Sequence, residues 1–214
     1  MDVSNELSLL GIKVLAKVLD IRNRDEVIFF INSLPASWHE IDVLVNNAGL
    51  AAGLSSFADG DLDDWDQMID TNIKGLLYIS RQIIPQMVAR KSGHIINIGS
   101  IAGKEIYPNG NVYCGTKHAV DALTKSMRRE LAEHHIRVTA IHPGAVETEF
   151  SIVRFKGDEE KAAKVYQGFE NLVADDIAEA ILWCVSRPAN VNINDLVIMP
   201  TAQPAAGLII KDKS

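Results

Sequence analysis

Cysteine is scarce in this sequence, which has two cysteines, Cys114 and Cys184, in 214 residues. Two cysteines provide neither a disulfide framework nor the ligand pattern of a structural zinc site. The six histidines do not follow metal-ligand spacing either, so we expect no metal: His39, His94, His118, His134, His135 and His142. Reduced thiols of this kind are typical of a cytoplasmic protein.

Clusters of basic residues and long apolar runs are missing as well. Lys and Arg number 21 against 28 Asp and Glu, which gives a formal charge of −7. Non-specific nucleic-acid binding depends on clustered Lys and Arg, so we expect no nucleic-acid partner. No apolar run reaches the roughly 18 residues needed to span a bilayer, and the polar start, Met1 to Glu6, does not resemble a signal peptide. We therefore expect a cytoplasmic protein without a membrane partner.

What the sequence does contain is an alternation of short apolar runs with longer segments of helical periodicity. This pattern predicts one α/β domain over residues 1–214, with a doubly wound, Rossmann-like parallel sheet. Strands are expected over residues 13–19, 41–45, 94–98, 137–141 and 195–199. Helices are expected over residues 3–10, 25–34, 61–91, 111–134, 159–169 and 175–186.

Unusual polar and glycine residues follow the predicted strands. They are Asp20, the run Asn46 to Gly49, Ser100, and the pair Pro143-Gly144. Open parallel sheets bind ligands at the carboxyl ends of their strands, so these residues mark a candidate site. Tyr113 and Lys117 stand four residues apart on the next predicted helix, which places both on one helical face.

The ordered set of these residues resembles the motif series of classical short-chain dehydrogenases. The matching elements are Asn46-Asn47-Ala48-Gly49, Asn72, Ser100, Tyr113-x-x-x-Lys117, and Pro143-Gly144 with Thr148. A Tyr and a Lys at this spacing are weak evidence alone, whereas the whole series in order is specific. The resemblance extends from Asp20 nearly to the C-terminus and implies a nicotinamide-dependent oxidoreductase.

The resemblance also implies four catalytic residues: Asn72, Ser100, Tyr113 and Lys117. Tyr113 would exchange a proton with the substrate oxygen, helped by a pKa that Lys117 and the nicotinamide cation lower. Ser100 would hold the reacting oxygen, and Asn72 would support a proton relay to the lysine. Each residue alone also has a purely structural interpretation, as a surface hydroxyl, a solvated charge or a partner for backbone groups; only the set favours catalysis.

The implied cofactor contacts divide into two ends. Adenine would lie beside Asp20 and Ile21, although Asp20 is equally suited to cap a strand end. The nicotinamide ribose would lie near Asn47, Ala48, Gly49, Tyr113 and Lys117, and the carboxamide against Pro143, Gly144, Val146 and Thr148. The run Asn46-Asn47 could also be a simple turn.

Within the family, the C-terminal half is most similar to the NADP-dependent 3-hydroxy acid (serine or allo-threonine) dehydrogenases. The similarity lies in residues 148–151, 153–157 and 191–194. It implies NADP, with NAD not excluded, and a small hydroxy acid or carbonyl substrate in contact with Ser100, Tyr113 and Arg154. Arg154 would bind the carboxylate, or else make a surface or interface ion pair. The family's long helices imply a homo-oligomer, a dimer or a homotetramer.

The segment before Asp20 departs from the family pattern. A dinucleotide site normally begins with a strand, a glycine-rich turn and a helix N-terminus, and none of these precedes Asp20 in the sequence. We therefore expect a domain that is incomplete at its N-terminus and lacks its first two strands, roughly 30–40 residues. In the family's strand order these strands lie between the one ending at Asp20 and the one before Asn46. The 214-residue chain is accordingly expected to bind the cofactor poorly by itself.

Two other interpretations are compatible with parts of the sequence. Extended-type relatives, such as sugar-nucleotide epimerases and dehydratases, also use Tyr-x-x-x-Lys, but they need a sizeable C-terminal substrate domain. Fewer than 100 residues follow Lys117, and most of them are predicted to belong to the same sheet. The second alternative is a truncated, non-catalytic subunit or regulator of the same fold.

Overall fold

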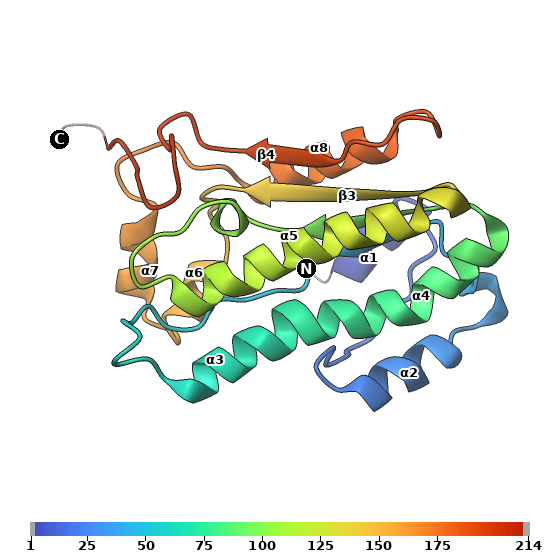
Figure 1. Ribbon diagram of the computed structural model, residues 1–214, viewed down its shortest axis with the longest axis horizontal. Coiled ribbons are helices and arrows are strands. Elements are labelled where there is room, and N and C mark those ends of the chain that lie inside the picture. Colours follow the sequence, from blue (N-terminus) through green and yellow to red (C-terminus); the bar gives the residue numbers. More distant parts are fainter. Residues whose placement is uncertain (1–2, 212–214) are drawn as a thin grey trace.

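The computed structural model describes residues 3–211 and contains one four-stranded sheet. Its strands are parallel and lie side by side in chain order: β1 (Val43–Asn46), β2 (Gly93–Ile98), β3 (Ile136–Pro143) and β4 (Asp195–Ile198). Asn46 lies opposite Asn97, and Pro143 lies opposite Ile198. The carboxyl ends of all four strands therefore meet at one edge of the sheet (Figure 1).

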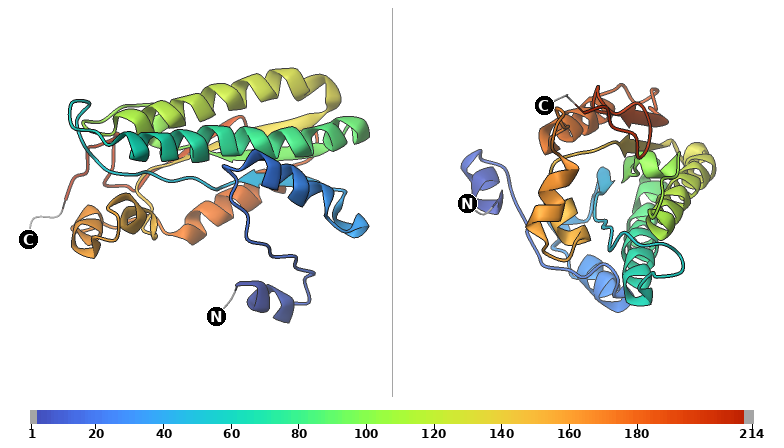
Figure 2. Two further views of the ribbon diagram at one scale, coloured as in Figure 1. Left: turned by 90° about the horizontal axis from the view of Figure 1, so that it is seen from below. Right: turned by 90° about the vertical axis from the view of Figure 1, so that its left-hand side faces the viewer.

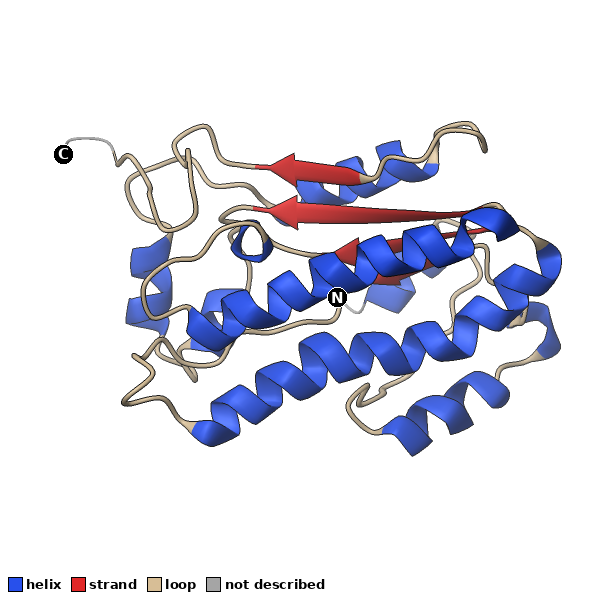
Figure 3. Ribbon diagram, viewed as in Figure 1, coloured by secondary structure: helices blue, strands red, loops and turns tan. Residues whose placement is uncertain are grey.

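Helices cover both faces of the sheet (Figures 2 and 3). One face is covered by a long helical stretch made of α3 (Leu62–Ile69), a π-helical turn (Asp70–Gly75) and α4 (Leu76–Arg90), together with α5 (Asn111–Leu131). The other face is covered by α8 (Ala174–Val185). The remaining helices are α1 (Val3–Leu9), α2 (Arg24–Asn32), α6 (Phe150–Arg154), α7 (Glu159–Val165) and three 3₁₀ turns (Ala36–Trp38, Ile101–Gly103 and Ala132–His134).

The hydrophobic core is divided by the sheet, because successive strand residues point to opposite faces. Ile95 packs with Leu76 and Ile83 of α4 and with Val120 of α5. Its neighbour Ile96 packs on the other face, with Ile141 and with Cys184 of α8. Strands that are buried on both faces read as continuous apolar runs, which is why β2 and β3 were predicted from the sequence.

One predicted strand is wrong. Residues 13–19 form no regular structure, and Val18 is fully exposed. A strand needs a neighbouring backbone to accept and donate its hydrogen bonds. Among residues 3–211, β1 pairs only with β2, so it is an edge strand and no strand stands next to residues 13–19. Asp20 consequently follows a loop and not a strand end.

The other predicted elements agree with the structure within a few residues, with two differences. The charged helix expected over residues 159–169 ends at Val165, and the short helix α6 was not predicted. Within residues 3–211, every helix is too short or too polar to cross a membrane.

Candidate active site

The helix α5 brings Tyr113 and Lys117 together one turn apart. Both residues are buried: 8% of the surface of Tyr113 and 6% of the surface of Lys117 are exposed. The Lys117 Nζ donates a hydrogen bond of 3.0 Å to the carbonyl of Ile98 at the end of β2. It also lies 5.9 Å from the centroid of the Tyr113 ring. The lysine thus ties the helix that carries the phenol to the carboxyl end of the sheet.

Ser100 lies where β2 turns into the 3₁₀ turn Ile101–Gly103. Its Oγ accepts a hydrogen bond of 3.1 Å from the backbone N–H of Ala102, which fixes the side chain at the start of that turn. The hydroxyl also acts on the neighbouring Tyr113 phenol, whose pKa it lowers. Ser100, Tyr113 and Lys117 therefore surround one point at the carboxyl edge of the sheet.

The ionisation of the pair is governed by burial. Burial raises the pKa of Tyr113 above its ordinary value, although the hydrogen bond from Ser100 and the charge of Arg154 oppose this shift. Burial also lowers the pKa of Lys117 to about 8. The chain's own residues do not produce the expected lowering of the phenol's pKa, because removal from water outweighs the charge of Arg154. The expected contribution of the nicotinamide cation stays a prediction. A buried, protonated phenol is suited to donate a proton.

Asn72 is buried in the π-helical turn and supports the loop that follows β1. Its Oδ1 accepts from the Leu50 N–H at 2.9 Å, and its Nδ2 donates to the Leu50 carbonyl at 2.8 Å and to the Thr116 hydroxyl at 3.0 Å. Gly49 fits closely beside it: an added Cβ would lie 3.2 Å from Asn72 Oδ1 and 3.4 Å from Lys117 Nζ. The side chain of Asn72 therefore positions the Gly49–Leu50 backbone beside the lysine.

A cavity of 1330 Å³ opens at this edge and gathers most of the residues that the sequence singles out. Among those that line it are Asn47, Gly49, Ser100, Tyr113, Lys117, Pro143, Gly144, Val146, Thr148 and Arg154. Ala48 and Asn72 adjoin these residues without being part of the lining, and Asp20 and Ile21 are not part of it either. The structure thus gathers in one cavity most of the residues predicted to contact the nicotinamide, but not those predicted to contact the adenine.

Asp20 is engaged by its own neighbour. Its carboxylate pairs with the Arg22 guanidinium at 2.7 Å, and this hydrogen-bonded contact lowers the pKa of Asp20 to about 2. Both side chains are 44% exposed. Ile21 packs against the long helical stretch, where a Cβ added to Gly75 would lie 2.5 Å from Ile21 Cδ1. Ile21 thus joins this pair to the helical layer, while the Asp20 carboxylate stays at the surface with Arg22.

Arg154 stands over the Tyr113 ring, with its guanidinium carbon 5.6 Å from the ring centroid. Its Nη2 donates to the Tyr107 hydroxyl at 3.0 Å, and its Nε donates to the Gly53 carbonyl at 3.2 Å. These contacts hold a cation at the cavity wall directly beside the phenol. Tyr107 was not singled out from the sequence, where it is one aromatic residue in a loop without a motif.

Comparison with known proteins gives a consistent result. The short chain dehydrogenase family matches residues 2–159. An NADP-dependent 3-hydroxy acid dehydrogenase of Salmonella typhi is 51% identical over 202 residues, covering 94% of this chain and 82% of the relative. A Schizosaccharomyces pombe protein of the same description is 41% identical over 214 residues, covering 100% of this chain and 83% of the relative.

Solved structures agree with the sequence relatives. The closed form of a serine dehydrogenase complexed with NADP⁺ superposes with a TM-score of 0.91 at 48% identity, covering 98% of this chain and 85% of that one. The Escherichia coli serine dehydrogenase gives a TM-score of 0.75 at 43% identity, covering 86% and 75% of the two chains.

Proposed function

This chain belongs to the short-chain dehydrogenase family, and from this premise we propose that it is an NADP-dependent oxidoreductase acting on the hydroxyl-bearing carbon of a small 3-hydroxy acid, such as serine. The observation that carries the proposal is the arrangement of Ser100, Tyr113 and Lys117 around one cavity, with Arg154 above the phenol. The two kinds of relative described above, hydroxy acid and serine dehydrogenases, support the choice of substrate.

The residues at the carboxyl edge fit the nicotinamide end of NADP. The absence of a side chain at Gly49 leaves backbone open beside Lys117, and Lys117 Nζ has donors in addition to the one it gives to the Ile98 carbonyl. We propose that Asn47, Ala48 and Gly49 lie against the nicotinamide ribose, and that Pro143, Gly144, Val146 and Thr148 lie against the carboxamide. When bound, NADP supplies the hydride acceptor or donor for the reaction. Asp20 and Ile21 stay our candidates for the adenine end.

The chain's own residues would move the proton. In reduction, the protonated Tyr113 phenol donates its proton to the substrate oxygen, while the Ser100 hydroxyl holds that oxygen in place. In oxidation the deprotonated Tyr113, a phenolate, accepts the proton of the substrate hydroxyl, and the ammonium of Lys117 favours this phenolate. Asn72 contributes by fixing the Gly49–Leu50 loop against the lysine. A role of Asn72 in a proton relay stays a proposal. Its side-chain amide already donates hydrogen bonds to the Leu50 carbonyl and to the Thr116 hydroxyl.

Arg154 would select the acid. A guanidinium held by Tyr107 and Gly53 at the cavity wall offers a fixed, charged partner for a substrate carboxylate, and Arg binds carboxylates well because its donors form a planar fork. The reacting carbon of a 3-hydroxy acid lies only two bonds from the carboxyl carbon. A cation beside Tyr113 therefore matches a substrate that carries both groups close together.

The Arg154→Ala variant tests this assignment. We expect the KM for serine to rise about tenfold or more, because a charge-assisted pair of about 1.5–3 kcal/mol is lost. Turnover of an uncharged secondary alcohol should change far less. Lys156→Ala is the matched control, since Lys156 is a neighbouring cation whose partners are Asp61 and Asp64. Equal losses on the two substrates would contradict the assignment of Arg154.

We further propose that the protein is a cytoplasmic homo-oligomer, a dimer or tetramer, that assembles through its long helices. Exposed apolar residues on that helical layer, Leu62 at 67% and Leu77 at 37%, support this arrangement. Sedimentation equilibrium would measure the mass of the assembly. A purely monomeric species at micromolar concentration would contradict it.

A further inference from the structure

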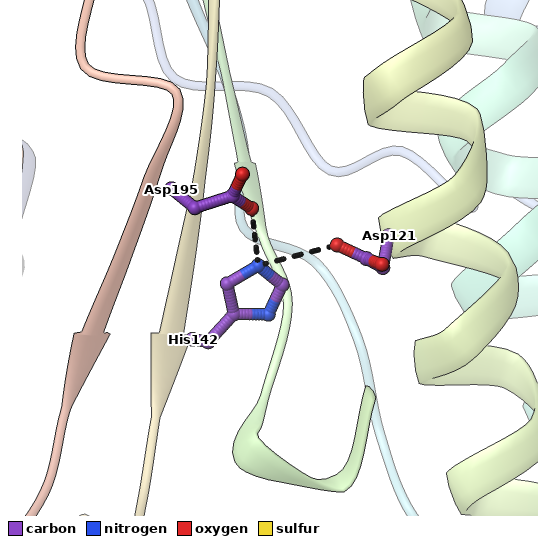
Figure 4. Close-up of side chains that lie close together, drawn as sticks. All are labelled: Asp121, His142 and Asp195. Carbon is purple, nitrogen blue, oxygen red and sulfur yellow. Dashed lines mark hydrogen bonds and ion pairs between the residues drawn. The ribbon is translucent and has the colours of Figure 1, made fainter. Parts of the chain in front are cut away.

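A polar cluster centred on a buried histidine lies next to the Ser100 loop, outside the set of residues that line the cavity. It consists of His142 near the end of β3, Asp195 at the start of β4, and Asp121 on α5 (Figure 4). His142 is completely buried. Its Nε2 lies 3.2 Å from Asp195 Oδ1 and 3.6 Å from Asp121 Oδ1. The cluster thus joins two strands to the helix that carries Tyr113 and Lys117.

These three side chains place their ligand atoms within 4.8 Å of one another, an arrangement that a metal ion could use. The Lys104 ammonium, however, already lies between the carboxylates, 2.6 Å from Asp121 Oδ1 and 3.2 Å from Asp195 Oδ1. Lys125 also pairs with Asp121, and Arg128 with Asp195. The cation of this cluster is therefore the side chain of Lys104, and the cluster is an ion-pair network and not a metal site.

The other side of the His142 ring faces the Ser100 backbone. Its Nδ1 lies 3.2 Å from the Ser100 carbonyl oxygen. The ring also fills the space beside Gly99, where an added Cβ would lie 2.5 Å from Nδ1. Any side chain at position 99 would displace the ring or the loop. His142 is thus in direct contact with the two backbone units that lead into Ser100.

Both ring nitrogens face hydrogen-bond acceptors, so a charged ring donates in both directions and a neutral ring in one. Burial and the charge of Lys104 lower the pKa of His142, while Asp195, the Ser100 carbonyl and Asp121 oppose this shift. The carboxylates have donors of their own in Lys104, Lys125 and Arg128. The Ser100 carbonyl also accepts from the Gly103 N–H at 2.9 Å, a contact within its own loop. The ring is the side chain that links this carbonyl to the sheet.

We propose that His142 is a positioning residue for Ser100. By donating from Nδ1 to the Ser100 carbonyl and packing on Gly99, it holds the Ser100 hydroxyl where it meets the Tyr113 phenol. The carboxylates of Asp195 and Asp121 lie on the other side of the ring, where Lys104 pairs with both. The inference rests on the role of Ser100 in the proposed function, and it adds a residue that touches neither the substrate nor the cofactor.

Two substitutions of His142 distinguish the contact with Ser100 from the contact with Asp195. His142→Asn places an amide donor near the position of Nδ1, toward Ser100, whereas His142→Gln places it near Nε2, toward Asp195. The readout is the ¹³Cζ NMR signal of Tyr113 in the full chain, which reports the hydrogen bond to its hydroxyl and needs no turnover. Tyr113→Phe assigns the signal among the four tyrosines, and Ser100→Ala gives its position when the serine hydroxyl is absent.

We expect His142→Asn to keep the wild-type signal and His142→Gln to shift it toward the Ser100→Ala value. Equal signals in the two variants, or a shift in His142→Asn alone, would overturn the proposal. Asp195→Asn, which leaves the ring in place, provides a second test if the histidine variants fold poorly. It should keep the wild-type signal, and a value like that of Ser100→Ala would also overturn the proposal.

Kinetics separate this inference from the proposed function. With saturating NADPH, His142→Gln should lower kcat about tenfold while KM and cofactor affinity hold, and His142→Asn should stay within about threefold of wild type. The same substitutions at His94, a buried histidine bonded to Thr139, control for general destabilisation. If Ser100→Ala leaves kcat unchanged, the proposed role of Ser100 fails. If it lowers kcat and the two His142 variants are equal, the inference about His142 fails alone.

Discussion

The middle of the sheet and the N-terminal segment of this protein are built in opposite ways. Polar side chains at the centre are almost completely buried, among them His94, Asn97, Thr139 and His142, at 0–1% exposed. In residues 3–22 the structure describes no buried side chain, and Val18 and Leu9 are largely exposed. Burial therefore fixes the side chains in the middle of the sheet, whereas the side chains of residues 3–22 are fixed by few contacts.

This difference falls on the two ends of the proposed cofactor site. The nicotinamide end is built from residues held by hydrogen bonds across separate elements, such as Lys117 to Ile98 and Asn72 to Leu50. The adenine end, Asp20 and Ile21, has an exposed ion pair and the packing of a half-buried Ile21 against Gly75. Substitutions at the first end should accordingly have large effects on catalysis or stability, and those at the second end small ones.

The largest effect is expected from Tyr113→Phe, which removes the proton donor and little volume. General acid or base catalysis contributes about 10²–10⁴-fold to a rate, so we expect kcat to fall by that factor. Cofactor affinity, measured by NADPH fluorescence, should stay within a fewfold of wild type. Tyr78→Phe on α4 is the matched control and should leave kcat unchanged. A Tyr113→Phe variant with near wild-type turnover would contradict the proposed mechanism.

The buried centre should also make the fold sensitive to acid. Burial lowers the pKa of His94 to about 4 from an ordinary value of 6.5, so the folded state favours the neutral ring. The stability that this provides is complete above pH 6.5 and is lost as the pH falls toward 4. The loss is about 1.4 kcal/mol per pH unit, or roughly 3 kcal/mol in all.

His94→Gln removes this titration and keeps a side chain that can bond Thr139. Between pH 7 and pH 5, the free energy of unfolding should fall by about 2 kcal/mol less in the variant than in wild type. Urea denaturation at the two pH values measures this. His134→Gln, at a partly exposed histidine, is the control. Parallel losses in wild type and His94→Gln would show that other groups determine the acid sensitivity.

A smaller effect is expected at Gly49, where the backbone lies close to the side chains of Asn72 and Lys117. A Cβ there would lie 3.2 Å from Asn72 Oδ1, which must shift slightly in Gly49→Ala, and 3.4 Å from Lys117 Nζ, in ordinary contact. We expect kcat to fall about tenfold with little change in stability. Gly115→Ala on α5 meets nothing within 4 Å and should add up to about 1 kcal/mol of stability, with unchanged kcat. Equal kinetics in the two variants would contradict close packing at Gly49.

The sequence predicted the centre of the fold well, because burial on both faces leaves a continuous apolar signal in β2 and β3. The candidate site residues at the strand ends and on α5 could also be predicted from the sequence, because the carboxyl ends of parallel strands meet at one edge of the sheet. The strand predicted over residues 13–19 failed because its apolar pattern carries no information on whether a neighbouring strand is present to pair with it.

Other features depend on contacts between distant residues and leave no local pattern. Tyr107 holds Arg154 across 47 positions of sequence, and His142 meets Ser100 across 42. The raised pKa of Tyr113 likewise follows from the depth of its burial, which the Tyr-x-x-x-Lys motif does not specify. Motifs thus indicated the candidate reacting groups, while the residues that contact them, Tyr107 and His142, emerged only from the three-dimensional arrangement.

The smallest effect is expected at the N-terminal end of the comparison, from Asp20→Ala. The carboxylate pairs with Arg22, but both side chains are 44% exposed, and exposed pairs contribute about 0–1 kcal/mol. The pKa of Asp20 is lowered to about 2, so the contribution is present above about pH 4 and is lost as the pH falls toward 2. Urea unfolding at pH 7 should therefore differ from wild type by less than about 1 kcal/mol. A loss of more than about 2 kcal/mol would show that this segment is anchored as firmly as the centre of the sheet, and the contrast between the two regions would fail.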